Sequence, residues 1–315
     1  MNRCPITYEE IEADRSYSNR GLSLLFRSLE DLLPFPYSLE EQLQLASELA
    51  TKISIQGVQP KLSARLDPKQ RSFVAVEKNG QYILKPQNPL FSNLPENEDL
   101  TMKLASLAGL EVPFHGLARA KDDSLFYFIR RFDRHFDGRG RSEKIAVEDF
   151  AQLAGLSRDT KYSYSIEKII TLIDRYMTFP AVEKARFFRL VLFNFLTGNE
   201  DAHLKNYSVI FQNDTYRFSP CYDLLNSTLA LGGEAAEESA LPLKGKKSRF
   251  TGKDFLGYLA RDRLELTAKV TNSISEELEA AVSPWKKVIE KSFLPFNRKE
   301  QYRNIVMERA GRLFG

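Results

Sequence analysis

The sequence predicts an α+β protein with a β-rich N-terminal half and a helical C-terminal half. Its 315 residues correspond to about two domains of ordinary size, and 43% of them are hydrophobic, which is enough for a sizeable core. Strand-type runs lie mostly before Asp133, whereas helical spacing of apolar residues dominates after it. We therefore expect a β-rich N-terminal lobe at 1–129, a hinge at 130–132 and a helical C-terminal lobe at 133–315.

The N-terminal half contains patterns for two helices and three strands. Asn79-Gly80 supplies the two positive-φ positions of a type I′ turn between short apolar runs, which predicts a hairpin. In the second helix pattern, Leu100, Leu104 and Leu107 fall on one face. The expected helices are residues 40–50 and 97–109, and the expected strands are residues 73–76, 82–84 and 125–130.

The C-terminal half begins with a polar segment, residues 135–143, that we expect to be an exposed loop. Apolar residues then recur with helical spacing over most of the remaining chain. Asn213-Asp214 separates two short strand patterns, which predicts a second hairpin. The expected helices are residues 148–155, 166–176, 181–196 and much of 253–315, and the expected strands are residues 207–211 and 216–218.

The composition excludes several classes of protein. With only Cys4, Cys221 and three histidines, we expect no disulfide framework, no cysteine-based zinc site and no all-histidine metal site. A formal net charge of +3 is too small to predict nucleic-acid binding, so no direct DNA contact is expected. The chain has neither a run of about 18 apolar residues nor a signal-peptide core. We therefore expect a soluble, cytoplasmic protein with no membrane partner.

Three separated segments carry residues suited to phosphoryl transfer. Asp201 and Asn206 lie five positions apart, which is the offset between the catalytic Asp and the magnesium-binding Asn of protein kinases. Asp223 follows the second hairpin, where a kinase carries its other magnesium-binding Asp. Lys85 ends a strand, where a lysine can hold the α- and β-phosphates of ATP. This order favours a phosphotransferase with a two-lobed, protein-kinase-like fold.

Each of these residues also has an ordinary interpretation. An Asp-x-x-x-x-Asn match is common by chance, Asp223 can close a turn, and Lys85 can be a solvated charge at a strand end. Glu98 either pairs with Lys85 or is a solvated carboxylate like Glu96 and Asp99. The chain lacks Gly-x-Gly-x-x-Gly, His-Arg-Asp and Gly-x-x-x-x-Gly-Lys-Ser/Thr motifs, which excludes ordinary eukaryotic-type protein kinases and P-loop ATPases.

Five ordered motifs lie between residues 54 and 224. They are Ser-Ile-Gln-Gly-Val-Gln-Pro-Lys at 54–61, Tyr-Ile-Leu-Lys-Pro at 82–86, Arg-Phe-Asp-Arg at 131–134, Asn-Glu-Asp-Ala-His-Leu-Lys-Asn at 199–206 and Tyr-Asp-Leu at 222–224. Together they resemble the motifs of the HipA-like serine/threonine kinases, the toxins of bacterial type II toxin–antitoxin systems. The resemblance implies an ATP- and Mg²⁺-dependent serine/threonine protein kinase.

The resemblance also implies roles for individual residues. Asp201 matches the catalytic base, Asn206 and Asp223 match magnesium ligands, and Lys85 matches a residue that contacts an ATP phosphate. Ser54 stands where the family carries an autophosphorylated serine. The other residues expected to bind ATP are Gln56, Gly57, Val58, Gln59 and Lys61 in a phosphate-covering loop, Arg130, Arg131 and Phe132 in the hinge that holds adenine, and His203, Lys205 and Tyr222 in the nucleotide pocket.

The expected partners also follow from the resemblance. The chain is too short for the further N-terminal subdomain of larger members, so it resembles the short HipT type, in which a separate small protein corresponds to that piece. Cognate antitoxin proteins, including such a small one, are expected partners. The expected substrate is an aminoacyl-tRNA synthetase with tRNA bound, with the tryptophanyl enzyme as a candidate. The basic run at 244–249 is either a solvated loop or a contact for such a substrate.

Two alternatives stay open at this point. Arg130 replaces an acidic hinge residue of the larger members, which weakens a side-chain role there more than it weakens ATP binding. The rival to an active kinase is a catalytically silent nucleotide-binding module that works by docking partners. Four intact residues argue against this rival: Lys85, Asp201, Asn206 and Asp223.

Overall fold

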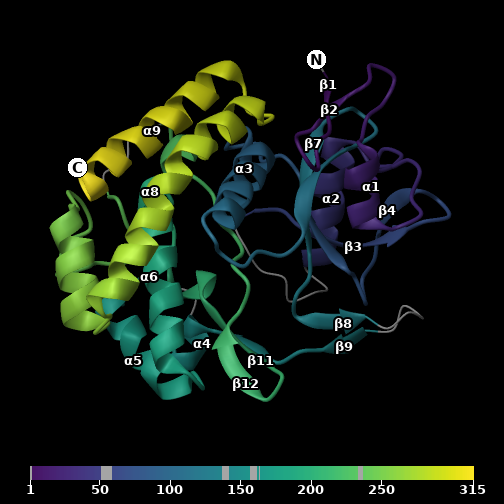
Figure 1. Ribbon diagram of the computed structural model, residues 1–315. Helices are drawn as coiled ribbons and strands as arrows, with labels where there is room; N and C mark the ends of the chain where they lie inside the picture. Colours follow the sequence, from purple (N-terminus) through teal and green to yellow (C-terminus); the bar gives the residue numbers. More distant parts are fainter. Residues whose placement is uncertain (1, 51–58, 137–141, 157–161, 163, 233–236) are drawn as a thin grey trace. The chain divides into compact units, whose positions relative to one another are not determined.

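The computed structural model describes residues 2–50, 59–136, 142–156, 162, 164–232 and 237–315. The chain forms two compact units (Figure 1). The first unit comprises Met1–Leu100, Pro113–Glu143 and Lys291–Leu294, and the second comprises Thr101–Val112, Lys144–Glu290 and Pro295–Gly315. The first is built around a sheet and the second is mainly helical, as the sequence predicts. The lobe boundaries and the hinge at 130–132 stay a prediction.

The first unit contains a five-stranded antiparallel sheet with the order β4-β3-β5-β7-β6. Figure 1 labels β3, β4 and β7 of this sheet. Aromatic side chains fill its core, with Phe73 contacting the rings of Tyr82, Phe126 and Phe128 at centroid distances of 5.2–6.0 Å. The strands are β3 (Leu62–Asp67), β4 (Ser72–Ala75), β5 (Tyr82–Lys85), β6 (His115–Arg119) and β7 (Leu125–Arg130).

The expected hairpin across Asn79-Gly80 is wrong, although both of its strands exist. β4 and β5 each pair with β3, a strand that the sequence analysis did not identify, and not with each other. The backbone φ is positive at Asn79 (58°) but not at Gly80. Gly80 is needed for a different reason, because a Cβ there would lie 2.0 Å from Ser63 Oγ on β3. The glycine therefore permits close approach to β3.

Three helices begin in the first unit: α1 (Asn19–Leu25), α2 (Leu39–Ala50) and α3 (Leu94–Leu107). Ser18 caps α1 by accepting a hydrogen bond from the Gly21 N–H. The expected helix at 97–109 corresponds to α3, in which Leu100 and Leu104 are buried and Leu107, at the end of the helix, is 51% exposed. The other strands of this region are β1 (Asn2–Arg3), β2 (Glu10–Ile11), β8 (Arg134–Phe136) and β9 (Ser142–Lys144).

The expected loop at 135–143 is thus only partly a loop, because β8 and β9 at its two ends pair with each other. Residues 137–141 lie outside the described part of the chain. The short strands were missed because the segment is polar and lacks the apolar alternation of a half-buried strand.

The second unit contains the three-stranded sheet β10-β11-β12 and most of the helices (Figure 1). The predicted hairpin is confirmed, since Asn213 and Asp214 join its strands with φ values of 51° and 56°. Part of the expected helix at 148–155 is instead a strand that pairs with this hairpin. The strands are β10 (Val147–Asp149), β11 (Ser208–Gln212) and β12 (Thr215–Phe218).

Helix α6 is the buried centre of the second unit. Pro180 occupies its first turn, and Gly198 ends it with a φ of 70°, as is usual for a glycine after a helix. Between them, Phe187, Phe188 and Leu192 are fully buried. The helices are α4 (Phe150–Leu153), α5 (Ile166–Tyr176), α6 (Pro180–Thr197), η1 (Leu204–Asn206), α7 (Ser227–Ala230), the π-helical η2 (Lys253–Arg263), α8 (Ala268–Lys291) and α9 (Phe296–Phe314).

None of the helices in the described ranges combines the length and the apolar character that crossing a bilayer requires.

Candidate phosphotransfer and nucleotide-binding residues

Lys85 forms a buried ion pair in the first unit. Its Nζ lies 2.6 Å from Glu98 Oε1, and the two side chains are 8% and 2% exposed. The Lys85 ammonium also lies 5.7 Å from the centroid of the Tyr127 ring on the neighbouring strand β7. The alternative in which Glu98 is a solvated carboxylate is therefore wrong, and Lys85 is not a solvated strand-end charge.

The neighbouring carboxylates Glu96 and Asp99 are also buried, contrary to a solvated role. Asp99 Oδ1 lies 2.9 Å from His115 Nδ1, and Glu96 accepts a hydrogen bond from Gln87 Nε2 at 2.9 Å. Burial raises the pKa of Glu96 above its usual value. Three carboxylates in the first turns of α3 are thus buried, and each has its own partner: Gln87 for Glu96, Lys85 for Glu98 and His115 for Asp99.

A buried ion pair adds little to the stability of a fold, because desolvation of the two charges offsets much of their attraction. Such pairs are common where a charge has to be held in one place for binding or chemistry. The contact with Glu98 therefore holds the Lys85 ammonium group in one position at the end of β5.

The expected phosphate-covering loop is described only at its end. Ser54, Gln56, Gly57 and Val58 lie outside the described residues, whereas Gln59 and Lys61 lead into β3. On β3, Leu62 pairs with Leu84 of β5. Continuing this register by one residue brings Lys61 to the level of Lys85. Two lysines thus share one end of the sheet, which suits an anionic ligand.

The side chain of Arg130 has its partners within the first unit. Its guanidinium lies 5.6 Å from the Tyr82 ring centroid and 5.3 Å from that of Phe114, and it donates to Tyr82 Oη at 3.0 Å. The next residue, Arg131, donates from Nε to Asp133 Oδ1 at 2.8 Å. These contacts engage the Arg130 and Arg131 side chains within the first unit. They leave the predicted roles of the hinge residues, including Phe132, as predictions.

In the second unit, the segment after α6 is held by bonds to two other helices. The Glu200 N–H donates to Ser227 Oγ at 2.6 Å, while Glu200 Oε1 accepts from Thr228 Oγ1 and from Arg309 Nη2, both at 2.6 Å. The Arg309 and Glu200 side chains are 6% and 8% exposed. Burial raises the pKa of Glu200. The residue before Asp201 is therefore fixed by α7 and α9.

The loop from Asp201 to Asn206 is tightly turned. The His203 N–H donates to Asp201 O at 2.8 Å and to Asn206 Oδ1 at 3.1 Å, so the predicted metal ligand Asn206 also caps η1. Tyr162 Oη donates to Asp201 Oδ1 at 2.5 Å. Sequence reasoning missed Tyr162, since it lies 39 residues from Asp201 and belongs to no motif.

Tyr222 ties the segment that carries Asp223 to this loop. Its hydroxyl donates to Lys205 O at 2.8 Å and lies 2.5 Å from Ser208 Oγ. Burial raises the pKa of Tyr222, so it stays a neutral phenol. Asp223 itself has a φ of 53°, in the left-handed region. Such a conformation at a non-glycine residue is uncommon and often marks functional positions.

The side-chain oxygens of Asn206 and Asp223 suit Mg²⁺ better than a metal ion whose ligands all come from the protein. Among the residues that the structure describes, no group of three or more His, Cys, Asp and Glu side chains is arranged to hold a metal. Asn206 and Asp223 offer one amide oxygen and one carboxylate. Mg²⁺ commonly takes only one or two protein oxygens and completes its shell with phosphates and water. The two residues fit such an ion bound together with a nucleotide.

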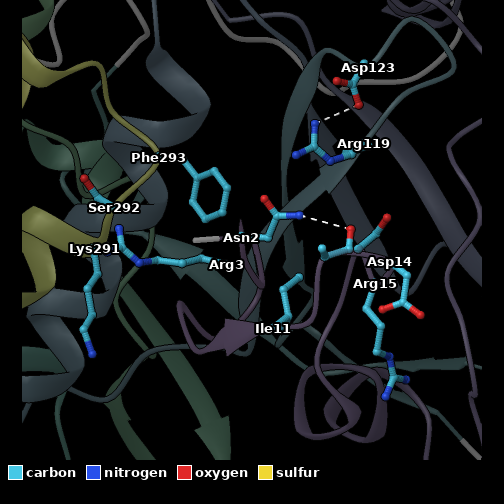
Figure 2. Close-up of a pocket in the computed structure, with 12 residues that line it drawn as sticks. Asn2, Arg3, Ile11, Asp14, Arg15, Arg119, Asp123, Lys291, Ser292 and Phe293 are labelled. Carbon is cyan, nitrogen blue, oxygen red and sulfur yellow. Dashed lines mark hydrogen bonds and ion pairs between the residues drawn. The ribbon is translucent and has the colours of Figure 1, made fainter.

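A separate pocket of about 460 Å³ lies in the first unit, and none of its lining residues is a predicted site residue. Figure 2 shows that its cationic side chains do not converge, since Arg119 points to Asp123 while Arg3 extends toward Ser292. The pocket is lined by Asn2, Arg3, Ile11, Ala13, Asp14, Arg15, Ser16, Arg119, Asp123, Lys291, Ser292 and Phe293.

Known proteins share both sequence and fold with this chain. A Haemophilus influenzae protein described as "Putative kinase" is 28% identical over 323 aligned residues, which cover 94% of this chain and 92% of that protein. The serine/threonine-protein kinase toxin HipA of Shewanella oneidensis is 28% identical over 197 residues. That match covers 56% of this chain and 43% of HipA, so the chain spans less than half of that relative's length.

A solved HipA chain, from a complex of HipA, HipB and operator DNA of Shewanella oneidensis, matches with a TM-score of 0.70 and 22% identity. The match covers 90% of this chain and 73% of that one. It confirms the predicted α+β, kinase-like fold. The model of the HipA-like C-terminal domain family matches residues 53–285, well over half of the sequence. The chain belongs to the HipA-like C-terminal domain family.

Proposed function

We propose that this protein is an ATP- and Mg²⁺-dependent serine/threonine protein kinase. The observation that carries the proposal is the buried pair of Lys85 and Glu98, because it presents a fixed ammonium group at a strand end that the sequence matches to a phosphate contact. Asp201 and Asn206 on one anchored loop, and Asp223 in a left-handed conformation, supply the remaining groups.

In this proposal each residue has one task. Lys85 and Lys61 neutralise phosphate charge, and Asn206 and Asp223 hold Mg²⁺, which supplies further charge neutralisation when bound. Asp201 accepts a hydrogen bond from the serine hydroxyl and takes its proton as that oxygen bonds to the γ-phosphorus. The bond from the γ-phosphorus to the bridging oxygen breaks, and ADP leaves. Positioning and charge stabilisation supply most of the catalysis in such reactions.

The roles of the remaining predicted residues belong to the same proposal. Gln56, Gly57, Val58 and Gln59 would cover the phosphates with backbone and side-chain donors. The hinge residues 130–132 would hold adenine through backbone groups. Further contacts with the nucleotide would come from His203, Lys205 and Tyr222.

We further propose that the kinase acts as a growth-inhibiting toxin of the short HipT type. Support comes from the family and from the relative named as a HipA toxin. The proposed substrate is an aminoacyl-tRNA synthetase, with the tryptophanyl enzyme as the first candidate. The HipA chain of similar fold is bound to HipB, which supports an antitoxin as a partner.

The basic run at 244–249 gives little support for an RNA contact. Lys246 Nζ lies 2.8 Å from Asp254 Oδ2, and Lys247 Nζ lies 3.1 Å from Glu237 Oε2. Both lysines are thus paired within the second unit, which favours the structural interpretation of this segment.

Incubation with γ-labelled ATP and a whole-cell extract tests the proposal, with the labelled proteins identified by mass spectrometry. We expect label on a synthetase serine, at a rate that requires Mg²⁺. Tight ATP binding without label on any protein would favour the silent docking module instead.

A further inference from the structure

The hydroxyl group of Tyr162 donates a hydrogen bond to the carboxylate of Asp201. The distance from Tyr162 Oη to Asp201 Oδ1 is 2.5 Å, and of the residues described, Tyr162 alone donates a side-chain hydrogen bond to this carboxylate. The Tyr162 ring also packs edge-on against His203, with 5.1 Å between ring centroids and 79° between ring planes. Both contacts lie within the second unit, and both fall on the loop that carries the proposed base.

The contact between Tyr162 and Asp201 resembles the one that the hydroxyl group of a bound protein substrate makes with a kinase's catalytic carboxylate. A kinase carboxylate accepts a hydrogen bond from the substrate hydroxyl before transfer, and a distance of 2.5 Å is typical of a bond to an ionised oxygen. Burial, together with the hydrogen bond and charge of Asp201, raises the pKa of Tyr162. The phenol therefore keeps its proton at neutral pH and remains a donor.

Tyr162 is not part of a core. Its side chain is 42% exposed, so it can leave Asp201 without opening a cavity. A tyrosine fixed for structural reasons alone would be expected to bury more of its ring.

We propose that Tyr162 competes for the acceptor position on Asp201 Oδ1, so that a protein hydroxyl or a water molecule that uses this oxygen displaces the phenol before transfer. The inference rests on the proposed kinase function. A protein substrate brings many contacts with which to displace the phenol, whereas water brings none. Tyr162 would therefore suppress the wasteful reaction in which water attacks the γ-phosphorus, its proton passes to Asp201, and ADP and phosphate leave.

Hydrolysis of ATP without a protein substrate tests this role directly. ADP release is measured with ATP and Mg²⁺ for the wild type, Tyr162→Phe, Asp201→Asn and the double variant. Loss of one competing hydrogen bond should raise the rate for Tyr162→Phe about threefold to tenfold. The double variant should be as slow as Asp201→Asn, because the gain depends on the carboxylate.

Tyr164→Phe is the matched control. Tyr164 lies two residues after Tyr162 in the chain, and Lys168 Nζ lies 5.6 Å from the centroid of its ring. The same loss of a hydroxyl there should leave ADP release unchanged. An equal gain in the Tyr164 variant would point to a loosened segment and overturn the competitor role.

The other outcomes are equally decisive. A slower or unchanged Tyr162→Phe enzyme would overturn the inference, and a slower one would make Tyr162 a positioning residue. Phosphate found on Tyr162 by mass spectrometry would overturn it as well, because the phenol would then be an acceptor. If neither the wild type nor Tyr162→Phe exceeds Asp201→Asn, the kinase proposal itself fails, and this inference fails with it. Activity that Asp201→Asn abolishes, without a gain in Tyr162→Phe, contradicts only the competitor role.

Discussion

Lys85 Nζ and Glu98 Oε1 lie 2.6 Å apart, joining the end of β5 to the first turns of α3 inside the first unit. The pair is held from the helix side by a second contact, since the adjacent Asp99 lies 2.9 Å from His115 Nδ1 on β6. Both bonds fix the start of α3 to the sheet. The ammonium group of Lys85 is thereby kept in one orientation, which is what contact with a phosphate requires.

Replacement of Glu98 by glutamine should weaken ATP binding and the fold together. The change leaves the Lys85 ammonium buried without its counter-charge, and breaking a buried pair in this way typically costs about 3–5 kcal/mol. We expect a lower midpoint of thermal unfolding and ATP affinity reduced about tenfold or more, measured by calorimetry. Glu96→Gln is the matched control. It changes a buried carboxylate two residues away that bonds Gln87, and ATP affinity should stay close to that of the wild type.

Asn206→Ala and Asp223→Ala should each reduce the dependence of ATP binding on Mg²⁺. Amide and carboxylate oxygens suit a hard cation, and Asp223 should matter more because it carries charge. The measurement is ATP titration at several magnesium concentrations. Binding that is insensitive to magnesium in the wild type and unaffected by both substitutions would show that the metal ligands lie elsewhere.

The pH dependence of stability should reveal the contact between Glu238 and α9. Burial opposes ionisation of Glu238, but hydrogen bonds from Arg312 and the Phe250 N–H outweigh it and hold the pKa of Glu238 below its usual 4.5. A lowered folded-state pKa means that the stabilisation is present above about pH 4.5 and is lost as the pH falls through the folded-state pKa.

Glu238→Gln should therefore lower the free energy of unfolding at pH 7 by about 1.5–3 kcal/mol, as expected for hydrogen bonds to a charged group. The difference from the wild type should shrink as the pH falls below 4.5, the usual pKa of this carboxyl group. Denaturant unfolding followed by circular dichroism at pH 7 and in acid gives both values. A difference that is constant with pH would rule out the charged contact.

Ser54, which lies outside the described residues, is predicted to become phosphorylated by the protein itself. A phosphate there would add about −1.5 to −2 charges beside a loop proposed to cover ATP, so it should block nucleotide binding. Mass spectrometry should find phosphate at Ser54 in the wild type and not in Asp201→Asn. Ser54→Ala should retain ATP binding, and Ser54→Asp should lose part of it. Absence of the phosphate after long incubation with ATP and magnesium would refute the self-limiting step alone.

The sequence predicted local structure better than pairing. Asn213-Asp214 sets its own turn, so the hairpin of β11 and β12 could be read from neighbouring residues. The strands on either side of Asn79-Gly80 were also found, but their shared partner β3, which directly precedes β4 in the chain, was not. Strand order depends on which apolar faces meet in the folded core, and a turn signal does not contain that information.

The same limit applies to the candidate site. The order of Lys85, Asp201, Asn206 and Asp223 is a property of the sequence, whereas the choice of Glu98 as the partner of Lys85 depends on how α3 packs on the sheet. Tyr162 could not have been found at all, because one exposed tyrosine has no pattern around it. Its meaning comes only from the 2.5 Å contact with Asp201.

Transfer of γ-labelled phosphate by the wild type and by Asp201→Asn, with ATP binding measured in parallel, tests the central claim most directly. Asparagine keeps the size of the side chain but cannot take the hydroxyl proton. The account predicts near-equal ATP affinity for the two proteins and a loss of label transfer of about 100-fold or more in Asp201→Asn. Equal transfer by both proteins, or no transfer by a wild type that binds ATP, would contradict it.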